Sequence, residues 1–260
     1  MGDFSFRAVE VLRSVRAVLA EDTRHTRHLL DRYDIATPMV AYHEHNEARS
    51  TPVLLQRLRV GEDLALVTDA GTPLLSDPGA RLVGAAIAAE IPVVPVPGAS
   101  ALLAALVASG IDAERFTFFG FLPRKGRERG EAVEALLSLP HTAVVYESPA
   151  RLSETLGELV ERGLGERHAA VAREMTKHYE EVRRGTLSAL HAYYSDSPPR
   201  GEIVLVIAGA PPSAPSEEAV RERARLLRAR GSSVRDTATA LATEFGVGRN
   251  VAYRIAQEEG

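Results

Sequence analysis

Two strand–loop–helix units follow one another in the chain, and they constrain its fold more than any other feature of the sequence. The first covers residues 64–89 and the second covers residues 91–110. In each unit an apolar stretch of strand character leads into a loop of small residues, and the loop leads into an apolar helix. Ligands of an open α/β sheet bind in the crevice outside the carboxyl ends of its strands. The two loops therefore predict a small-molecule site where they lie side by side.

The alternation of short strands and helices continues from the first residues to about Gly209. The helical segments carry apolar residues at three- and four-residue spacing. We predict strands at Ala17–Ala20, Leu64–Thr68, Val93–Val96, Phe116–Phe119, Ala143–Tyr146, Ala169–Ala172 and Ile203–Ala208. Such alternation is typical of an α/β fold, and it predicts a largely parallel sheet with helices on its faces.

Changes in composition predict the division into domains. A polar stretch at residues 111–115 separates an N-terminal α/β subdomain, residues 1–112, from a C-terminal α/β subdomain, residues 113–210. Proline and serine make residues 211–218 a linker, because they sustain neither strand nor helix. Residues 219–260 form a separate helical module, and their Gly-containing turn resembles that of a helix-turn-helix. The spacing favours a small capping bundle, with contact to nucleic acid as the alternative.

Composition excludes several classes of protein. The 260 residues include no cysteine, so the chain has no disulfide framework, thiolate metal site or cysteine nucleophile. No signal peptide and no apolar run of roughly 18 residues is present, and we expect a cytoplasmic protein without a membrane partner. The net charge of −4 argues against general coating of nucleic acid, although a local basic surface remains compatible with RNA binding.

The first loop, Asp69 to Pro73, combines a carboxylate with small residues. Gly71 permits a positive φ angle, and Pro73 fixes the backbone, so a ligand could approach the main chain closely. Neither the dinucleotide fingerprint nor the P-loop pattern is present. The alternative is a tight structural turn. In the second loop, which covers residues 97–101, Ser100 can cap the following helix, whose first N–H groups are free.

A basic segment follows the first predicted strand. Asp22 or Thr23 can cap the next helix, and Arg24, Arg27 and His28 share one face of that helix. The face could contact phosphate, and a solvated basic face is the alternative. Lys125 and Lys177 are the only lysines among 31 basic residues. Lysine, unlike arginine, can lose its proton when it is desolvated, so either lysine could have a chemical role; two ordinary surface lysines are the alternative. No spacing of His, Asp and Glu indicates a metal site, and we expect no metal.

Seven segments together resemble a known family over nearly the whole chain. In chain order these segments are AEDTRHTRHLL, VTDAGTPLLSDPG, VPVPGASALLAAL, FFGFLPRK, YESPARL, AREMTKHYEEVRRGTL and GEIVLVIAG. They resemble motifs of the tetrapyrrole methylase superfamily and, within it, of the bacterial methyltransferases of small-subunit ribosomal RNA.

The resemblance implies two α/β subdomains with S-adenosylmethionine bound in the cleft between them, and a homodimer. The implied reaction methylates the 2′-hydroxyl of a specific cytidine in the RNA of the 30S subunit, and no metal is required. The cofactor residues would be Asp69, Ala70, Gly71, Thr72, Pro73, Ala99, Ser100, Ala101, Tyr146 and Glu147. Lys177, or else Glu174, would be the catalytic base. RNA would contact Arg24, Arg27, Arg124, Lys125, Arg183 and Arg184.

One departure from the family pattern concerns the start of the chain. Family members begin with an apolar strand and a TPIGN-like loop, which would precede Gly2 and Asp3 here. Without that strand we expect an exposed sheet edge beside the crevice. A misplaced start codon is the favoured explanation, and an inactive fragment is the alternative. Two other functions stay open: methylation of a tetrapyrrole or another small molecule, and a noncatalytic, truncated RNA-binding protein.

Overall fold

A computed structural model describes residues 2–211 and 216–259 of the chain. The chain divides into two compact units, Met1–Gly209 and Ala210–Gly260. The first unit contains two β-sheets with their helices, and the second contains helices only. The predicted α/β class with an added helical module is confirmed.

The first sheet has three parallel strands in the order β2-β1-β3. These strands are β1 (Ala17–Ala20), β2 (Met39–Ala41) and β3 (Leu64–Val67), and their helices are α1 (Phe6–Ser14), α2 (Thr23–Arg32), α3 (Glu47–Arg59) and α4 (Ala80–Ala88). Side chains of β1 alternate between the two faces of the sheet. Val18 packs with Leu12 and Leu30 of α1 and α2, whereas Leu19 packs with residues of α3 and α4. The central strand is therefore fully buried.

The predicted strand Val93–Val96 is not a strand in the structure. The chain between α4 and the next helix pairs with no described strand over this segment, and Val94 is 74% exposed. β3 is the edge strand of the first sheet on that side, since β1 is its only partner. An apolar run with strand character forms a strand only where a neighbour completes its hydrogen-bonded ladder.

The second sheet has the order β4-β5-β8-β6-β7. Its strands are β4 (Phe116–Phe121), β5 (Thr142–Glu147), β6 (His168–Arg173), β7 (Glu181–Thr186) and β8 (Ile203–Ile207). Only β4 and β5 pair in parallel, and the other three pairs are antiparallel. The expectation of a largely parallel arrangement is therefore wrong for this sheet. A short turn joins β6 to β7, and β8 returns between β5 and β6.

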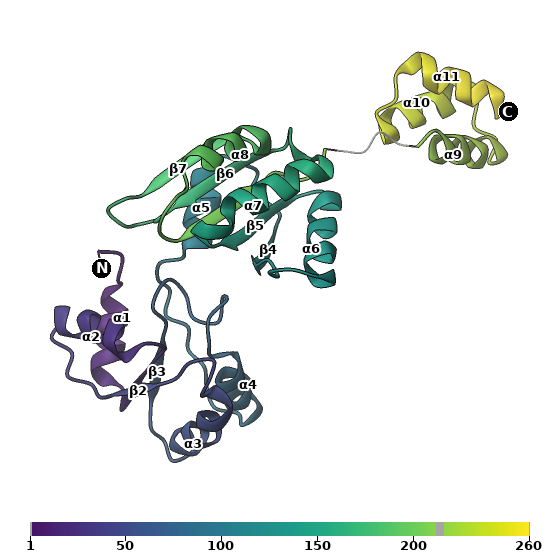
Figure 1. The fold of residues 1–260 in the computed structure, drawn as a ribbon. Coiled ribbons are helices and arrows are strands. Elements are labelled where there is room, and N and C mark those ends of the chain that lie inside the picture. Colours follow the sequence, from purple (N-terminus) through teal and green to yellow (C-terminus); the bar gives the residue numbers. More distant parts are fainter. Residues whose placement is uncertain (1, 212–215, 260) are drawn as a thin grey trace. The chain divides into compact units, whose positions relative to one another are not determined.

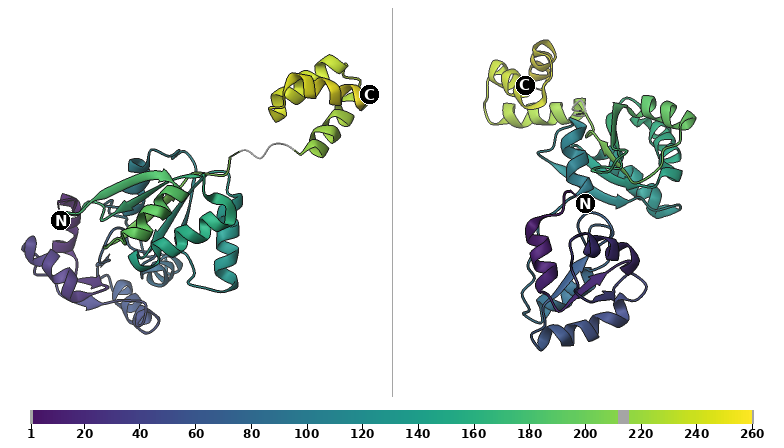
Figure 2. Two further views of the ribbon diagram at one scale, coloured as in Figure 1. Left: turned by 45° about the horizontal axis from the view of Figure 1, so that its top comes forward. Right: turned by 90° about the vertical axis from the view of Figure 1, so that its left-hand side faces the viewer.

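Helices cover both faces of the second sheet (Figures 1 and 2). One face carries α6 (Arg127–Ser138), α7 (Pro149–Leu159) and α8 (Leu187–Asp196), and α7 continues into the short η1 (Val160–Leu164). The opposite face carries α5 (Ala101–Ser109), whose Leu102 and Leu106 pack against Val144 and Val204. α5 thus belongs to the core of the second sheet, and the change between the two cores falls before Ala101 rather than at residue 112.

The second unit consists of three helices in its described residues. These are α9 (Glu217–Ala229), α10 (Val234–Phe245) and α11 (Arg249–Glu258). They enclose a small core of their own around Leu241, Ile255 and Val220. The predicted linker, residues 211–218, includes residues 212–215, which lie outside the described residues. Across the described ranges of both units, no helix is long and apolar enough to cross a membrane.

Candidate active site

Hydrogen bonds tie together the loops that follow β1 and β3. The Asp69 carboxylate accepts a bond from the backbone N–H of Asp22 at 3.3 Å. The Thr68 hydroxyl donates to Glu21 at 3.0 Å. Both contacts lie at the carboxyl ends of parallel strands, where an α/β sheet binds ligands. The predicted position of the crevice is therefore consistent with the local geometry.

The two small-residue loops lie side by side, as the sequence predicts. The hydroxyl of Thr72 in the first loop donates to the carbonyl of Ala99 in the second at 3.2 Å. Gly71 has a φ angle of +72°, which confirms the predicted left-handed conformation. Ser100 is the N-cap of α5, and its hydroxyl accepts a bond from the N–H of Leu103 at 3.4 Å. The second loop is thereby fixed to the start of α5.

A cavity of about 560 Å³ opens at these loops. Its lining includes Asp69, Ala70, Gly71, Pro73, Ala99 and Ala101 from the predicted cofactor residues. The turn between β6 and β7 closes the cavity with Met175, Thr176 and Lys177, and Glu202 joins from the segment before β8. Thr72 and Ser100 do not line it, since their hydroxyls make the loop contacts described above. Six of the predicted residues are thus brought together.

Tyr146 and Glu147 behave differently from the other predicted cofactor residues, and neither lines the cavity. The ring of Tyr146 packs against Phe118 and Phe121. Burial raises the pKa of its phenol, which also meets the backbone of Leu102 near the second loop. Glu147 is only 2% exposed and lies in a network of polar groups in the second core. We therefore leave Glu147 out of the cofactor site.

Lys177 is held by two carboxylates rather than by an apolar pocket. Its ammonium lies 3.0 Å from Glu174 and 3.0 Å from Glu202. Burial lowers the pKa of Lys177, but the bonds to these two carboxylates outweigh burial and raise it above its ordinary value. The expected role of general base requires a neutral amine, so the structure counts against that role. Lys177 remains a fixed positive charge at the wall of the cavity.

Glu174 fixes the turn between β6 and β7, which carries Lys177. Its carboxylate also accepts a bond from the backbone N–H of Glu202 at 2.9 Å. That hydrogen bond and the one from Lys177 lower the pKa of Glu174. A Cβ atom on Gly201 would overlap the Glu174 carboxyl group, so the close approach requires glycine. Glu174 is thus a positioning residue, and it does not line the cavity.

Asp77 is a candidate that the sequence-based assignment missed. Burial, together with the nearby carboxylates of Glu21, Asp69 and Glu202, raises the pKa of its carboxyl group to about 6, although the neighbouring Thr68 acts in the opposite direction. Asp77 does not itself line the cavity, but its neighbours Thr68 and Asp69 do. A carboxyl group of that pKa can accept a proton near neutral pH. The segment SDPG carried no recognisable signal for this, because the shift depends on groups distant in sequence.

The predicted RNA-binding residues fall into two groups. Arg27, Arg124 and Lys125 are exposed, and their side chains have no hydrogen-bond or ion-pair partner among the described residues. Arg24 is also exposed, but it forms an ion pair of 2.7 Å with Asp22. These four remain available at the surface.

Arg183 and Arg184 have structural partners instead. Arg183 lies 3.6 Å from the centre of the Tyr193 ring and pairs with Glu181 at 3.2 Å. Arg184 donates to the carbonyls of Ala108 and Ser109 at the C-terminal end of α5. A side chain that satisfies the last carbonyls of a helix stabilises that end. We remove both residues from the proposed RNA surface.

The first two helices supply a wall of the cavity that sequence reasoning did not find. Phe4, Ala8 and Leu12 contribute an apolar surface, and His25 and Leu29 extend it from α2. The amphipathic spacing of α1 predicted one buried face, but it could not distinguish packing from ligand contact. The cavity therefore joins apolar, small and charged groups.

Comparison with known proteins places this fold and site in a class. The family described as Tetrapyrrole (Corrin/Porphyrin) Methylases matches residues 1–191. The chain belongs to this family of methylases.

Closer relatives give the branch of the family. The ribosomal RNA small subunit methyltransferase I of Synechocystis is 45% identical over 99% of this chain and 94% of its own length. The protein of the same name from Pseudomonas aeruginosa is 44% identical over 100% of this chain and 94% of its own length. The one from Mesorhizobium japonicum is 51% identical over 81% of this chain and 72% of its own length. The chain is a member of the ribosomal RNA small subunit methyltransferase I group.

Solved structures agree on the fold. Uroporphyrin-III-C-methyltransferase from Thermus thermophilus superposes with a TM-score of 0.57 at 22% identity, over 80% of this chain and 88% of its own. A diphthine synthase gives a TM-score of 0.61 at 13% identity, over 80% and 85% of the two chains. A second structure of the Thermus enzyme, complexed with S-adenosyl homocysteine, gives 0.55 at 18% identity, over 80% and 91%. At these identities the similarity establishes the architecture.

Proposed function

We propose that this chain transfers a methyl group from S-adenosylmethionine to the 2′-hydroxyl of a specific cytidine in small-subunit ribosomal RNA. The observation that carries the proposal is the cavity at the two small-residue loops, which the Lys177 turn closes. The relatives with 44% and 45% identity over 94% of their length support the ribosomal substrate. We propose further that the protein acts as a homodimer in the cytoplasm, where ribosomal subunits are found.

The residues of the cavity fit the cofactor. A volume of about 560 Å³ lies in the usual range for small-molecule sites, roughly 300–1,000 Å³. S-adenosylmethionine has an apolar base surface, hydroxyls, an amino acid group and a positive sulfonium. Phe4 and Leu12 would contact its apolar surface, and the Asp69 carboxylate its positive or hydroxyl groups. Gly71 and Ala99 expose backbone groups in the two loops. When bound, the cofactor supplies an electrophilic methyl group.

The protein's contribution is position and charge. The acceptor oxygen must approach the methyl group in line, so much of the acceleration comes from holding the two reactants in place. The 2′-hydroxyl must also lose a proton. Asp77 can take it near neutral pH. The ammonium of Lys177, fixed by Glu174 and Glu202, would attract the oxygen as negative charge develops on it.

Single-turnover methyl transfer separates the two roles open to Lys177. If it acts as a fixed cation, Lys177→Arg retains most of the rate and Lys177→Met loses most of it. If it acts as a base, both variants lose the rate, because arginine does not deprotonate. Wild-type rates for both variants, with RNA bound normally, would remove Lys177 from the mechanism. If Asp77 is the base, the wild-type rate of methyl transfer should rise with pH near 6, and this rise should be absent in Asp77→Asn.

The substrate is tested with labelled cofactor and purified acceptors. We expect label in 30S particles and none in porphyrin-type macrocycles. Digestion of the labelled RNA to nucleosides should release 2′-O-methylcytidine. Label on a base, or transfer to macrocycles alone, contradicts the proposal. Binding of the cofactor without transfer to any acceptor would support a noncatalytic RNA-binding protein instead.

RNA would reach the cavity along the exposed cations Arg24, Arg27, Arg124 and Lys125. Phosphate contacts of this kind position an RNA without reading its sequence. Replacing Arg27 or Lys125 by glutamine should weaken 30S binding and lower its dependence on salt. Binding that is independent of salt in all variants would exclude this surface.

A further inference from the structure

The arginines of the second unit are divided between paired and unpaired side chains. Four of its eight arginines form ion pairs with glutamates: Arg221, Arg223 and Arg225 at 2.7–3.3 Å and Arg254 at 4.0 Å. Arg235 at the start of α10 and Arg249 at the start of α11 are exposed. Neither side chain has a hydrogen-bond or ion-pair partner among residues 216–259. Two positive charges are thus left free on neighbouring helices.

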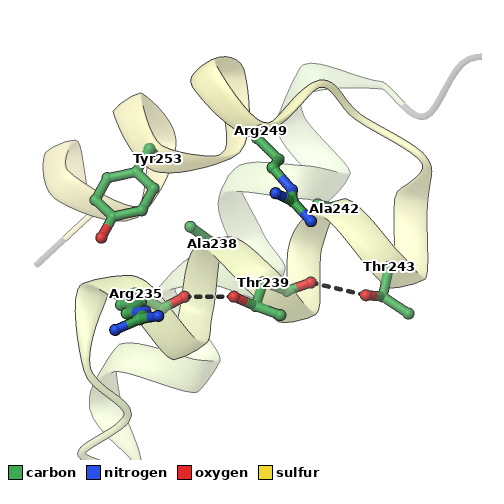
Figure 3. A pocket seen from close by; sticks show the side chains of 7 residues that line it. All are labelled: Arg235, Ala238, Thr239, Ala242, Thr243, Arg249 and Tyr253. Carbon is green, nitrogen blue, oxygen red and sulfur yellow. Dashed lines mark hydrogen bonds between the residues drawn. The ribbon is translucent and has the colours of Figure 1, made fainter.

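These two arginines belong to one hollow. A cavity of about 460 Å³ lies between α10 and α11, and the small side chains of Ala238 and Ala242 contribute to its lining. Figure 3 shows Arg249 extending from α11 toward α10, with Tyr253 one turn further along α11 and Arg235 at the other end of α10. The Tyr253 side chain is 44% exposed. The hollow therefore presents two guanidinium groups and an accessible aromatic ring.

Two threonines of the hollow are restricted to accepting hydrogen bonds. The hydroxyl of Thr239 donates its proton to the carbonyl of Arg235, and that of Thr243 donates to the carbonyl of Thr239, both at 2.9 Å (Figure 3). A hydroxyl has a single proton, so the oxygen of each threonine offers only lone pairs to a ligand. Such oxygens suit a ligand that carries its own O–H or N–H donors.

We propose that this hollow binds a single-stranded segment of RNA. The guanidinium groups of Arg235 and Arg249 would contact two backbone phosphates, and a base would stack on Tyr253. Thr239 and Thr243 would accept from ribose 2′-hydroxyls, which distinguish RNA from DNA. An acidic peptide would satisfy the arginines, and its backbone N–H groups could donate to the threonines, but it has no planar base to stack on Tyr253. The inference deepens the proposed function by adding a second contact with the substrate RNA, and it rests on that function for the identity of the RNA.

The test measures binding of the full chain to a fluorescent single-stranded RNA over a range of salt concentrations. Arg235→Gln with Arg249→Gln removes two charges from the hollow. The matched control, Arg230→Gln with Arg254→Gln, removes two exposed charges of the same unit that do not line it. Each lost phosphate contact reduces the steepness of log K, the logarithm of the RNA-binding constant, against log salt concentration by about 0.7. If the affinities of variant and wild type converge near about 1 M salt, the loss of two contacts weakens RNA binding about 25-fold at about 0.1 M salt. We expect the control to stay within about twofold of the wild type.

Tyr253 gives an independent arm of the test. Tyr253→Phe keeps the ring and should bind RNA as the wild type does, whereas Tyr253→Leu should lose roughly fivefold or more. DNA of the same sequence should bind more weakly than RNA. Equal loss in the hollow and control variants, equal binding of RNA and DNA, or displacement of RNA by polyglutamate at equal affinity would each overturn the inference.

Methyl transfer to 30S particles, measured on the same variants, separates this inference from the proposed function. If the wild type transfers no methyl group but the hollow variant alone loses RNA affinity, the RNA site stands and the proposed activity fails. If the wild type transfers methyl groups and the hollow variant matches it in RNA affinity, the proposed activity stands and the RNA site fails.

Discussion

Thr155 lies at the centre of a buried polar network, and its replacement by valine tests the structural role of Glu147. The Thr155 side chain has no exposed surface. Its hydroxyl donates to Glu147 at 2.7 Å and accepts from Arg129 at 3.1 Å. Valine has nearly the same shape but no hydroxyl. The substitution therefore removes two hydrogen bonds to charged groups and creates little empty space.

The expected loss follows from what the two charged partners retain. Glu147 keeps the backbone N–H of Ser148 at 2.8 Å and Arg151 at 3.5 Å. Arg129 keeps its hydrogen bonds to the Glu158 carboxylate at 2.6 Å and to the carbonyl of Pro123 at 3.0 Å. Neither charge is left alone, so each lost bond counts at the lower end of its usual range. We expect Thr155→Val to lower the free energy of unfolding by about 3 kcal/mol.

Urea unfolding of the first unit, followed by the signal of its helices, measures this loss. Thr23→Val is the matched control, since its hydroxyl makes no hydrogen bond among the described residues. The KM for the cofactor should stay at the wild-type value, because Glu147 acts on the fold rather than on the ligand. A change in stability below about 0.5 kcal/mol, the range of ordinary surface substitutions, would refute the reasoning. A raised KM with unchanged stability would return Glu147 to the cofactor site.

Three further outcomes are expected. Gly201→Ala should lower the free energy of unfolding by about 1–2 kcal/mol in urea, since Gly201 has a φ angle of +88° and the new methyl group would meet Glu174. Gly84→Ala is the control and should cause no such loss, because no atom of the described residues, apart from its chain neighbours and its own helix backbone, lies within 4 Å of the new methyl group. The raised pKa of Asp77 stabilises the folded state below about pH 4, and this contribution is lost as the pH rises to about 6. Urea unfolding between about pH 4 and 8 should therefore show the wild type losing stability relative to Asp77→Asn over that window. Parallel plots of stability against pH for the two proteins would contradict this. Arg184→Met should cost about 1 kcal/mol of stability through the end of α5 and leave RNA affinity unchanged, and a selective loss of affinity would restore its RNA role.

Local signals in the sequence were sufficient for much of the first sheet and for the loops of the site. Ala17–Ala20 is a strand with the predicted bounds. The capping side chains of Asp22 and Ser100 accept the expected backbone hydrogen bonds. Each of these features depends on neighbours within a few residues. The two loops also lie beside each other as predicted, although the apolar stretch before the second loop forms no strand.

Features that depend on distant partners could not be predicted from the pattern. β7 reads EVRRGT and lacks an apolar run, yet it pairs with β6 along six residues. The antiparallel position of β8 depends on which strands are adjacent, and its apolar run fits either direction. In the site, Arg184 is basic in sequence, but its role depends on the helix end that lies against it. Charge identifies candidates, and tertiary contacts decide which of them are free.

Backbone strain gives an independent indication of where the function lies. Six non-glycine residues have positive φ angles in the described part of the chain. Four of them, Leu74, Ser76, Glu174 and Thr176, lie in or beside the two segments that meet at the larger cavity. Each such residue costs of order 1–3 kcal/mol, and the surrounding contacts must compensate for that cost. The bonds of Glu174 to Lys177 and Glu202 provide that compensation at the turn. A conformation that lowers stability and yet places Lys177 at the cavity wall is understandable if that position serves the reaction.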